Sequence, residues 1–116
     1  MQSTVFKEYR EINGQTFRVE VFYDLGGYNY FTYKPKARGY YVSVTPVTLS
    51  KGNGYTTETY MAFSGYKHLL LEVKRKSKKA AAEALEFSAN GIVKKLIRSC
   101  MYDLNMEIPE EYKEAV

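Results

Sequence analysis

The sequence predicts an α+β domain in which an antiparallel sheet of about five strands, arranged as a meander, is covered on one face by C-terminal helices. Three observations support this prediction. Apolar residues alternate along residues 1–63 but recur with helical spacing along residues 64–104. Asn-Gly and Gly-Gly pairs, which are typical of turns, separate the alternating runs. Aromatic residues make up 16% of the chain, and flat rings favour strands because they pack well on a pleated surface.

Length and composition restrict the kind of protein further. The chain has 116 residues, of which 45% are hydrophobic and 26% charged, as in ordinary globular domains. We therefore predict one domain over residues 1–116, with a strand-rich part at 1–63, a helical part at 64–104 and an acidic tail at 105–116. The chain has one cysteine, no apolar segment typical of a secretion signal and no apolar run of membrane-spanning length. A reducing cytoplasm is the expected compartment.

The first two strands flank the pair Asn13-Gly14, which is a strong hairpin signal between alternating runs. They span residues 4–12 and 16–24. One face of the second strand is apolar, whereas the other carries two charged residues, so we expect the apolar face to enter the core. This face carries Phe17, Val19, Val21 and Tyr23.

Three further strands follow. Gly26-Gly27 turns the chain into the third strand. In the fourth strand, Val42 and Val44 are expected to face the helices, so that Tyr41 faces away from them. The predicted segments are a third strand at 28–33, a loop at 34–39, a fourth strand at 40–49, a turn at 50–54 and a fifth strand at 55–63.

From Ser64 onward the apolar residues follow a helical period. Ser64 can cap the first helix, and the three alanines at 80–82 favour helix formation. Asn90-Gly91 predicts a stop or a kink, so that the helical part forms either two helices or one long helix broken near that pair. Ser77, a weak helix former, is a second candidate break. The acidic tail is expected to form a short extra turn or a loose end.

Catalytic and metal-binding patterns are sparse. His68 is the single histidine and Cys100 the single cysteine, and a dyad between them needs two separate helices to meet. A surface or half-buried histidine and a core thiol explain these two residues better. A zinc site needs more histidine or cysteine ligands than the two that the chain supplies. We therefore predict no catalytic residue, no metal site, no cofactor and a protein that is not an enzyme.

The aromatic stretch at residues 23–41 is the first candidate binding surface. Neighbouring side chains of a strand point to opposite faces, and the helices can cover only one face, so some tyrosines are expected on an open sheet face beside basic residues. Three interpretations stay open: a tyrosine-rich face without a partner, a face that binds a protein or a second copy of the chain, and a platform for base stacking. The predicted partner-binding residues are Tyr28, Tyr30, Tyr33, Lys34, Lys36, Arg38 and Tyr41.

The basic segment at residues 74–79 is the second candidate. The net charge is +4, and the positive residues are concentrated in the helical part. On a continuous helix, Lys74 faces Lys78 and Arg75 faces Lys79, and like charges at this spacing repel each other. The segment is then either a solvated helix face or an electrostatic contact for phosphates or for an acidic protein surface. The candidate residues for nucleic-acid or acidic-partner binding are Lys74, Arg75, Lys78 and Lys79.

The chain resembles small single-domain proteins of bacteriophages and other mobile elements in two runs, "REINGQTFRVEVFYDLGGYNYFTYKPKARGYYVSVTPV" and "YMAFSGYKHLLLEVKRKSKKAAAEA". Some proteins of this kind are anti-CRISPR inhibitors, which bind a CRISPR effector and stop it recognising or cutting DNA. The resemblance implies a non-catalytic inhibitor in the cytoplasm of a bacterial host that occupies a surface of a nucleic-acid enzyme. It assigns no role to any residue. The alternative is a small basic nucleic-acid-binding protein that uses residues 74–79 and the aromatic sheet.

Overall fold

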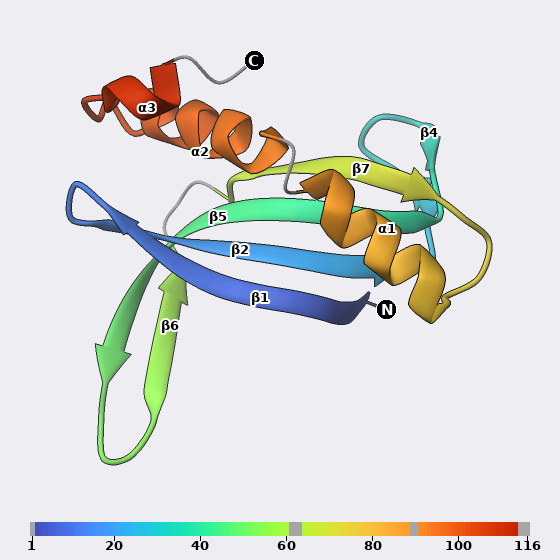
Figure 1. The fold of residues 1–116 in the computed structure, drawn as a ribbon, viewed down its shortest axis with the longest axis horizontal. Coiled ribbons are helices and arrows are strands. Elements are labelled where there is room, and N and C mark those ends of the chain that lie inside the picture. The colour runs from blue at the N-terminus through green and yellow to red at the C-terminus, as the bar shows by residue number, and fades with distance from the viewer. Residues whose placement is uncertain (1, 61–63, 89–90, 114–116) are drawn as a thin grey trace.

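The computed structural model describes residues 2–60, 64–88 and 91–113, and it shows a five-stranded antiparallel sheet with helices on one face (Figure 1). The predicted fold class is confirmed. The sheet strands are β1 (Gln2–Ile12), β2 (Gln15–Asp24), β5 (Gly39–Lys51), β6 (Thr56–Tyr60) and β7 (Tyr66–Glu72), a separate hairpin consists of β3 (Gly27–Asn29) and β4 (Lys34–Lys36), and the helices are α1 (Lys78–Ser88), α2 (Ile92–Asp103) and α3 (Glu110–Lys113).

The central strand of the sheet is β5. It pairs with β2 along one edge, and along its other edge it pairs first with β7 and then with β6. The far ends of β5 and β6 project from the sheet as a long hairpin (Figure 1). Gly65 (φ 85°) lets the chain enter β7 close beside β5, because a Cβ at this position would lie 2.0 Å from the Val44 carbonyl oxygen. The strands β6 and β7 therefore share one edge of β5.

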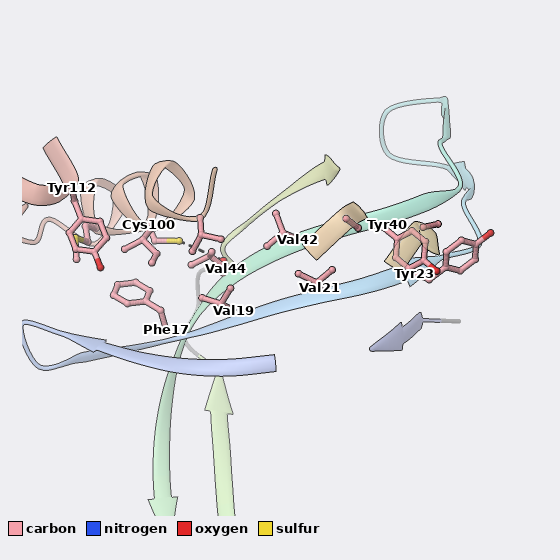
Figure 2. Packing of buried hydrophobic residues seen from close by; sticks show 14 residues of the cluster. Phe17, Val19, Val21, Tyr23, Tyr40, Val42, Val44, Cys100 and Tyr112 are labelled. Atoms are coloured by element: carbon pink, nitrogen blue, oxygen red, sulfur yellow. Dashed lines mark hydrogen bonds between the residues drawn. The ribbon is translucent and has the colours of Figure 1, made fainter. Parts of the chain in front are cut away.

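The hydrophobic core lies between the inner face of the sheet and the helices (Figure 2). Along β2 the inner-face side chains are the predicted ones, and along β5 Val42 and Val44 face the helices as expected. On α2, Cys100 is buried and its Sγ donates a hydrogen bond to the Val44 carbonyl at 3.7 Å. The buried residues of this core are Phe17, Val19, Val21, Tyr23, Tyr40, Val42, Val44, Ala80, Ala84, Val93, Ile97, Cys100, Met101 and Tyr112.

The prediction that the first helix starts near Ser64 is wrong. Tyr66–Glu72 forms β7, which pairs antiparallel with β5. The consecutive leucines at 69–71 fit either period, and the free edge of β5 selects the strand. Helix α1 starts later, after Ser77, whose Oγ accepts a hydrogen bond from the Ala80 N–H at 3.0 Å. Ser77, expected only as a possible break, is the N-cap of the first helix.

The later helices follow the predicted break. Helix α1 ends at Ser88, and α2 begins after Gly91, which adopts a left-handed conformation (φ 85°). The part of the chain expected as an acidic tail contains α3, whose Tyr112 is buried against α2 and the sheet. This segment is therefore a short extra turn that contributes to the core, up to residue 113.

The third and fifth predicted strands also need correction. The predicted strand at 28–33 is wrong, because β3 ends at Asn29 and the next four residues form a turn in which Tyr33 has a positive φ of 55°. Part of the predicted loop at 34–39 is strand β4. In the predicted fifth strand, β6 covers Thr56–Tyr60, and residues 61–63 lie outside the described residues.

Candidate interaction surface

Asp24, the last residue of β2, holds the base of the β3–β4 hairpin. Its Oδ1 accepts a hydrogen bond from the Gly26 N–H at 2.8 Å, and its Oδ2 pairs with the Lys36 Nζ at 2.6 Å. Gly26 (φ 77°) is required at this turn, because a Cβ would lie 2.6 Å from the Lys36 carbonyl oxygen. The carboxylate, of a residue only 6% exposed, therefore joins both ends of the hairpin.

The charge of Asp24 is stabilised where it lies. Burial alone raises the pKa of a carboxyl group, but the hydrogen bonds from Lys36 and from the Gly26 N–H outweigh this effect. The pKa of Asp24 is therefore lowered from its ordinary value of 3.8. At neutral pH the residue is ionised, so the ion pair with Lys36 is present.

Tyr41 was predicted as a partner-binding residue on an open face, but its side chain is almost fully buried. Tyr41 does face away from the helices, but only 7% of it is exposed. Its ring stacks on Phe22, with centroids 5.8 Å apart, and its hydroxyl donates to the Ala37 carbonyl at 2.6 Å. The Nζ atoms of Lys36 and Lys67 lie 5.5 and 5.7 Å from its centroid. Through these contacts Tyr41 stabilises the base of the β3–β4 hairpin, and it is not part of an open surface.

The β3–β4 hairpin, residues 27–36, presents its aromatic side chains to solvent, and we name it the aromatic arm. It lies beyond the start of β5 as a separate two-stranded element (Figure 1). Four rings within six residues are exposed, although folded proteins usually bury aromatic side chains. The exposed fractions are 49% for Tyr28, 77% for Tyr30, 97% for Phe31 and 78% for Tyr33.

The basic segment is not the continuous helix that the sequence predicts. Residues 74–77 form the loop between β7 and α1, and only Lys78 and Lys79 belong to the helix. Lys74 therefore does not face Lys78 across a helical turn, nor does Arg75 face Lys79. We name residues 74–79 the basic loop. All of its side chains are exposed, as a solvated surface or an electrostatic contact requires.

The basic loop has a defined backbone conformation despite its exposure. The Ser77 N–H donates to the Tyr40 hydroxyl at 3.3 Å, which anchors the loop to the core. Lys78 and Lys79 follow directly, in the first turn of α1, where positive charge is unfavourable because the helix dipole is positive at that end. These two lysines cost stability at their position, which is a reason to expect that they interact with an anionic group.

The aromatic arm and the basic loop lie at the same end of the sheet (Figure 1). Arg38 connects them: its Nε donates to the Leu25 carbonyl at 2.9 Å, and its Nη1 donates to the Lys74 carbonyl at 3.4 Å. Beside the start of the basic loop is an open groove of about 660 Å³ lined by Arg38, Glu72, Val73 and Lys74. Of the predicted basic residues, Arg38 thus contacts the basic loop, Lys36 is paired with Asp24, and Lys34 is exposed on β4.

Near its centre, the outer face of the sheet carries a polar network among the described residues. Arg18 forms an ion pair with Glu58 on β6, and its Nε lies 3.7 Å from Glu20 Oε1. The Tyr9 hydroxyl donates to Glu58 Oε2 at 2.6 Å. Among the described residues, this network occupies the centre of the outer face, whereas the exposed rings of residues 28–33 lie on the aromatic arm.

His68 and Cys100, the two residues considered for catalysis, lie on different elements and differ in exposure. The Cys100 thiol is fully buried against the Val44 carbonyl, and burial raises its pKa to about 12. A thiol with this pKa is not a thiolate at neutral pH, so it is a poor nucleophile. His68 lies in β7 opposite Val42 and is exposed. The geometry supports the interpretation of Cys100 as a core thiol.

Comparisons with known proteins add no assignment. No family model, curated protein or solved structure matches the chain. Within residues 2–60, 64–88 and 91–113, no group of three or more His, Cys, Asp and Glu side chains is placed to hold a metal ion. Among the helices in those same ranges, none is long and apolar enough to cross a membrane.

Two residues of the site were missed from the sequence. Phe31 is the most exposed ring of the aromatic arm, but strand alternation assigned it to a face rather than to a turn. Asp24 was not recognised as the residue that closes the hairpin. A usable signal was present, because an aspartate two residues before a glycine is typical of a turn in which the carboxylate accepts a backbone hydrogen bond.

Proposed function

We propose that the protein is a non-catalytic binding protein that docks onto a partner protein through the aromatic arm. The observation that supports this is the exposure of four aromatic side chains on a hairpin that Asp24 and Tyr41 hold in place. Tyrosine and phenylalanine offer a large contact area with few rotatable bonds, and a rigid base reduces the entropy lost on binding. Burying these rings against a partner removes apolar surface from water.

The positive charge around the arm indicates that the partner's surface is acidic. Lys34, Arg38 and the basic loop give this end of the molecule a positive potential. A protein that imitates nucleic acid to block an enzyme needs the opposite charge. If the partner is a nucleic-acid enzyme, as the sequence hypothesis has it, the arm then contacts an acidic surface outside the channel that binds phosphates.

Direct nucleic-acid binding is the second candidate, and the juxtaposition of arm and basic loop favours it. Aromatic rings beside lysines can stack bases while the lysines contact phosphates. This mode predicts a steep loss of affinity as the salt concentration rises, because each phosphate contact releases counterions. A partner bound mainly through the rings has a weaker salt dependence.

The test is affinity capture of host proteins with three chains: the wild type, the double variant Tyr30→Ala/Phe31→Ala and the control Tyr55→Ala. Tyr55 is 66% exposed but lies on the β5–β6 hairpin, away from the arm. We expect a nuclease-resistant protein partner that the arm variant loses and the control retains. A partner retained equally by all three chains contradicts the proposal.

The alternative is tested with the same preparation. We expect a Lys78→Glu/Lys79→Glu variant to lose nucleic acid if the basic loop binds phosphates, and to keep the protein partner if the arm is the main contact. Recovery of nucleic acid alone, removed by nuclease and by these two substitutions, would establish the second candidate instead.

A further inference from the structure

The outer edge of β1 is unpaired within the described part of the chain. β1 has 11 residues and pairs with β2 on one side, and none of the other strands in residues 2–60, 64–88 and 91–113 pairs with its second side. Figure 1 shows this edge along the border of the sheet. Such an edge exposes a row of backbone N–H and C=O groups to which another strand can bind.

A bulge divides this edge into two parts. The register with β2 shifts between Thr4 and Phe6, which interrupts regular pairing near the start of the strand. From Phe6 to Ile12 every residue lies opposite one residue of β2 without further shifts. The regular segment is therefore 6–12, and Tyr9 is its middle residue.

We propose that the protein forms a homodimer in which the segments Phe6–Ile12 of two copies pair antiparallel, with a two-fold axis through the two Tyr9 residues. Identical antiparallel strands in one sheet are related by an axis perpendicular to the sheet, so opposed residues share a face. With the axis at Tyr9, the entire regular segment of one copy pairs with that of the other.

The charges of the segment fit this register. Lys7 lies opposite Glu11 of the second copy, and Glu8 lies opposite Arg10 of the second copy, and each contact occurs twice by symmetry. Glu8 and Arg10 already pair within one chain, with 2.7 Å between Glu8 Oε1 and Arg10 Nε. In the dimer, Glu8 and Arg10 of the two copies form a ring of alternating charge, which favours association.

The neighbouring registers are unfavourable. A shift of two residues places either Glu8 opposite Glu8 or Arg10 opposite Arg10 on the axis, and like charges directly opposite each other repel. A shift of one residue is excluded because it would turn the inner face of one copy outward. Charged residues on an edge usually prevent pairing with other strands, and here they permit pairing with a second copy in one register.

The apolar residues of the segment also gain contacts. Phe6 lies opposite Val21 and therefore on the inner face, yet 41% of it is exposed. It borders a groove of about 250 Å³ between β1 and the helices, whose lining includes Leu85 and Val93. In the dimer Phe6 packs against Ile12 of the second copy, which removes part of this exposed ring from water.

The dimer presents two aromatic arms. Each arm follows Asp24, which lies opposite Gln2 at the start of β1. Because the two β1 strands run in opposite directions, the arms lie at opposite ends of one continuous sheet. The pairing uses no residue of the aromatic arm, so its failure leaves the proposed function intact, and the reverse also holds.

Sedimentation velocity over a range of concentrations tests the dimer with exposed residues that the core does not need. Lys7→Glu places two glutamates opposite each other at each contact, and Glu11→Lys places two lysines there, so each variant is expected to weaken the dimer at least tenfold. An equimolar mixture of the two variants restores both contacts and is expected to form a heterodimer. The double variant Lys7→Glu/Glu11→Lys is expected to form a homodimer again.

Far-UV circular dichroism and thermal unfolding confirm that each variant is folded, and Lys7 and Glu11 are both exposed in the single chain. A wild-type chain that stays monomeric at every concentration overturns the proposal, including the case in which the edge binds a strand of a different protein. Single variants that dimerise as the wild type does, or a mixture that fails to associate, also overturn it.

Discussion

Tyr23 and Tyr40 in the core and the tyrosines of the aromatic arm come from one stretch of sequence, yet they have opposite environments. Tyr23 and Tyr40 lie opposite each other on β2 and β5, with their rings edge to face and centroids 5.1 Å apart. Their hydroxyls reach backbone carbonyls, Val73 at 3.3 Å and Ser77 at 3.4 Å. In the arm, Tyr28 and Tyr30 also meet edge to face at 5.1 Å, but no helix covers them.

This difference shows what buries a tyrosine here. The ring needs a neighbour on an inner face, and the hydroxyl needs an acceptor within reach, because an unpaired buried hydroxyl is costly. The register of β2 with β5 supplies both. The turn at Asp24 and Gly26 takes the following residues out of the sheet, so the arm tyrosines have no inner face to enter.

The largest expected effect comes from breaking the buried pair. Tyr40→Ala removes a ring that is 2% exposed and is expected to lower the free energy of unfolding by about 3–5 kcal/mol. Tyr40→Phe keeps the ring and removes only the hydrogen bonds with Ser77, so its expected cost is about 0.5–1.5 kcal/mol. Urea denaturation measures both. Equal costs for the two variants would show that the hydroxyl, rather than the ring, stabilises the pair.

An intermediate effect is expected where the arm joins the sheet. Asp24→Asn removes the charge that pairs with Lys36 and is expected to cost about 1.5–3 kcal/mol at neutral pH. The pKa of Asp24 is lowered in the folded protein, so its contribution is present above the ordinary value of 3.8 and is lost as the pH falls through the folded pKa.

The pH dependence is measured by urea denaturation of both chains between pH 7 and about pH 2. The difference in the free energy of unfolding between wild type and Asp24→Asn is expected to shrink as the pH falls below about 3.8. Lys34→Ala, which changes an exposed lysine of β4, the strand that contains Lys36, is the control and should cost little at any pH. A difference that stays constant with pH would show that the charge of Asp24 does not hold the arm.

The smallest effect on stability is expected at the tip of the arm. Phe31→Ala changes a side chain that is 97% exposed, so the free energy of unfolding should change by no more than about 0.5 kcal/mol. Thermal and urea unfolding of the isolated chain measure this. A loss above about 1 kcal/mol would mean that the ring packs against the rest of the molecule, and the arm would then be a structural element.

Much of the fold follows from local patterns. The inner faces of β2 and β5, the turn at Asn13-Gly14 and the break before α2 were all predicted, because alternation and glycine conformation act within a few residues. The candidate site was predicted only in part. Alternation predicted that some tyrosines would be exposed but left open which ones, and Tyr28, Tyr30 and Tyr33 are exposed because they lie on a hairpin and not on an open sheet face.

The local sequence thus determines which side chains can face the core, where the chain can turn and where helices can end. Contacts between segments that are distant in sequence determine the remaining features of the fold. Tyr66–Glu72 becomes a strand because β5 has a free edge beside it, and Tyr41 is buried because Phe22 and the base of the arm cover it. The strand that pairs with β7 and the Phe22 ring that stacks on Tyr41 are both distant in sequence, so no local pattern specifies them. The free energy of such contacts depends on which distant segments meet, and this is known only once the whole chain has folded.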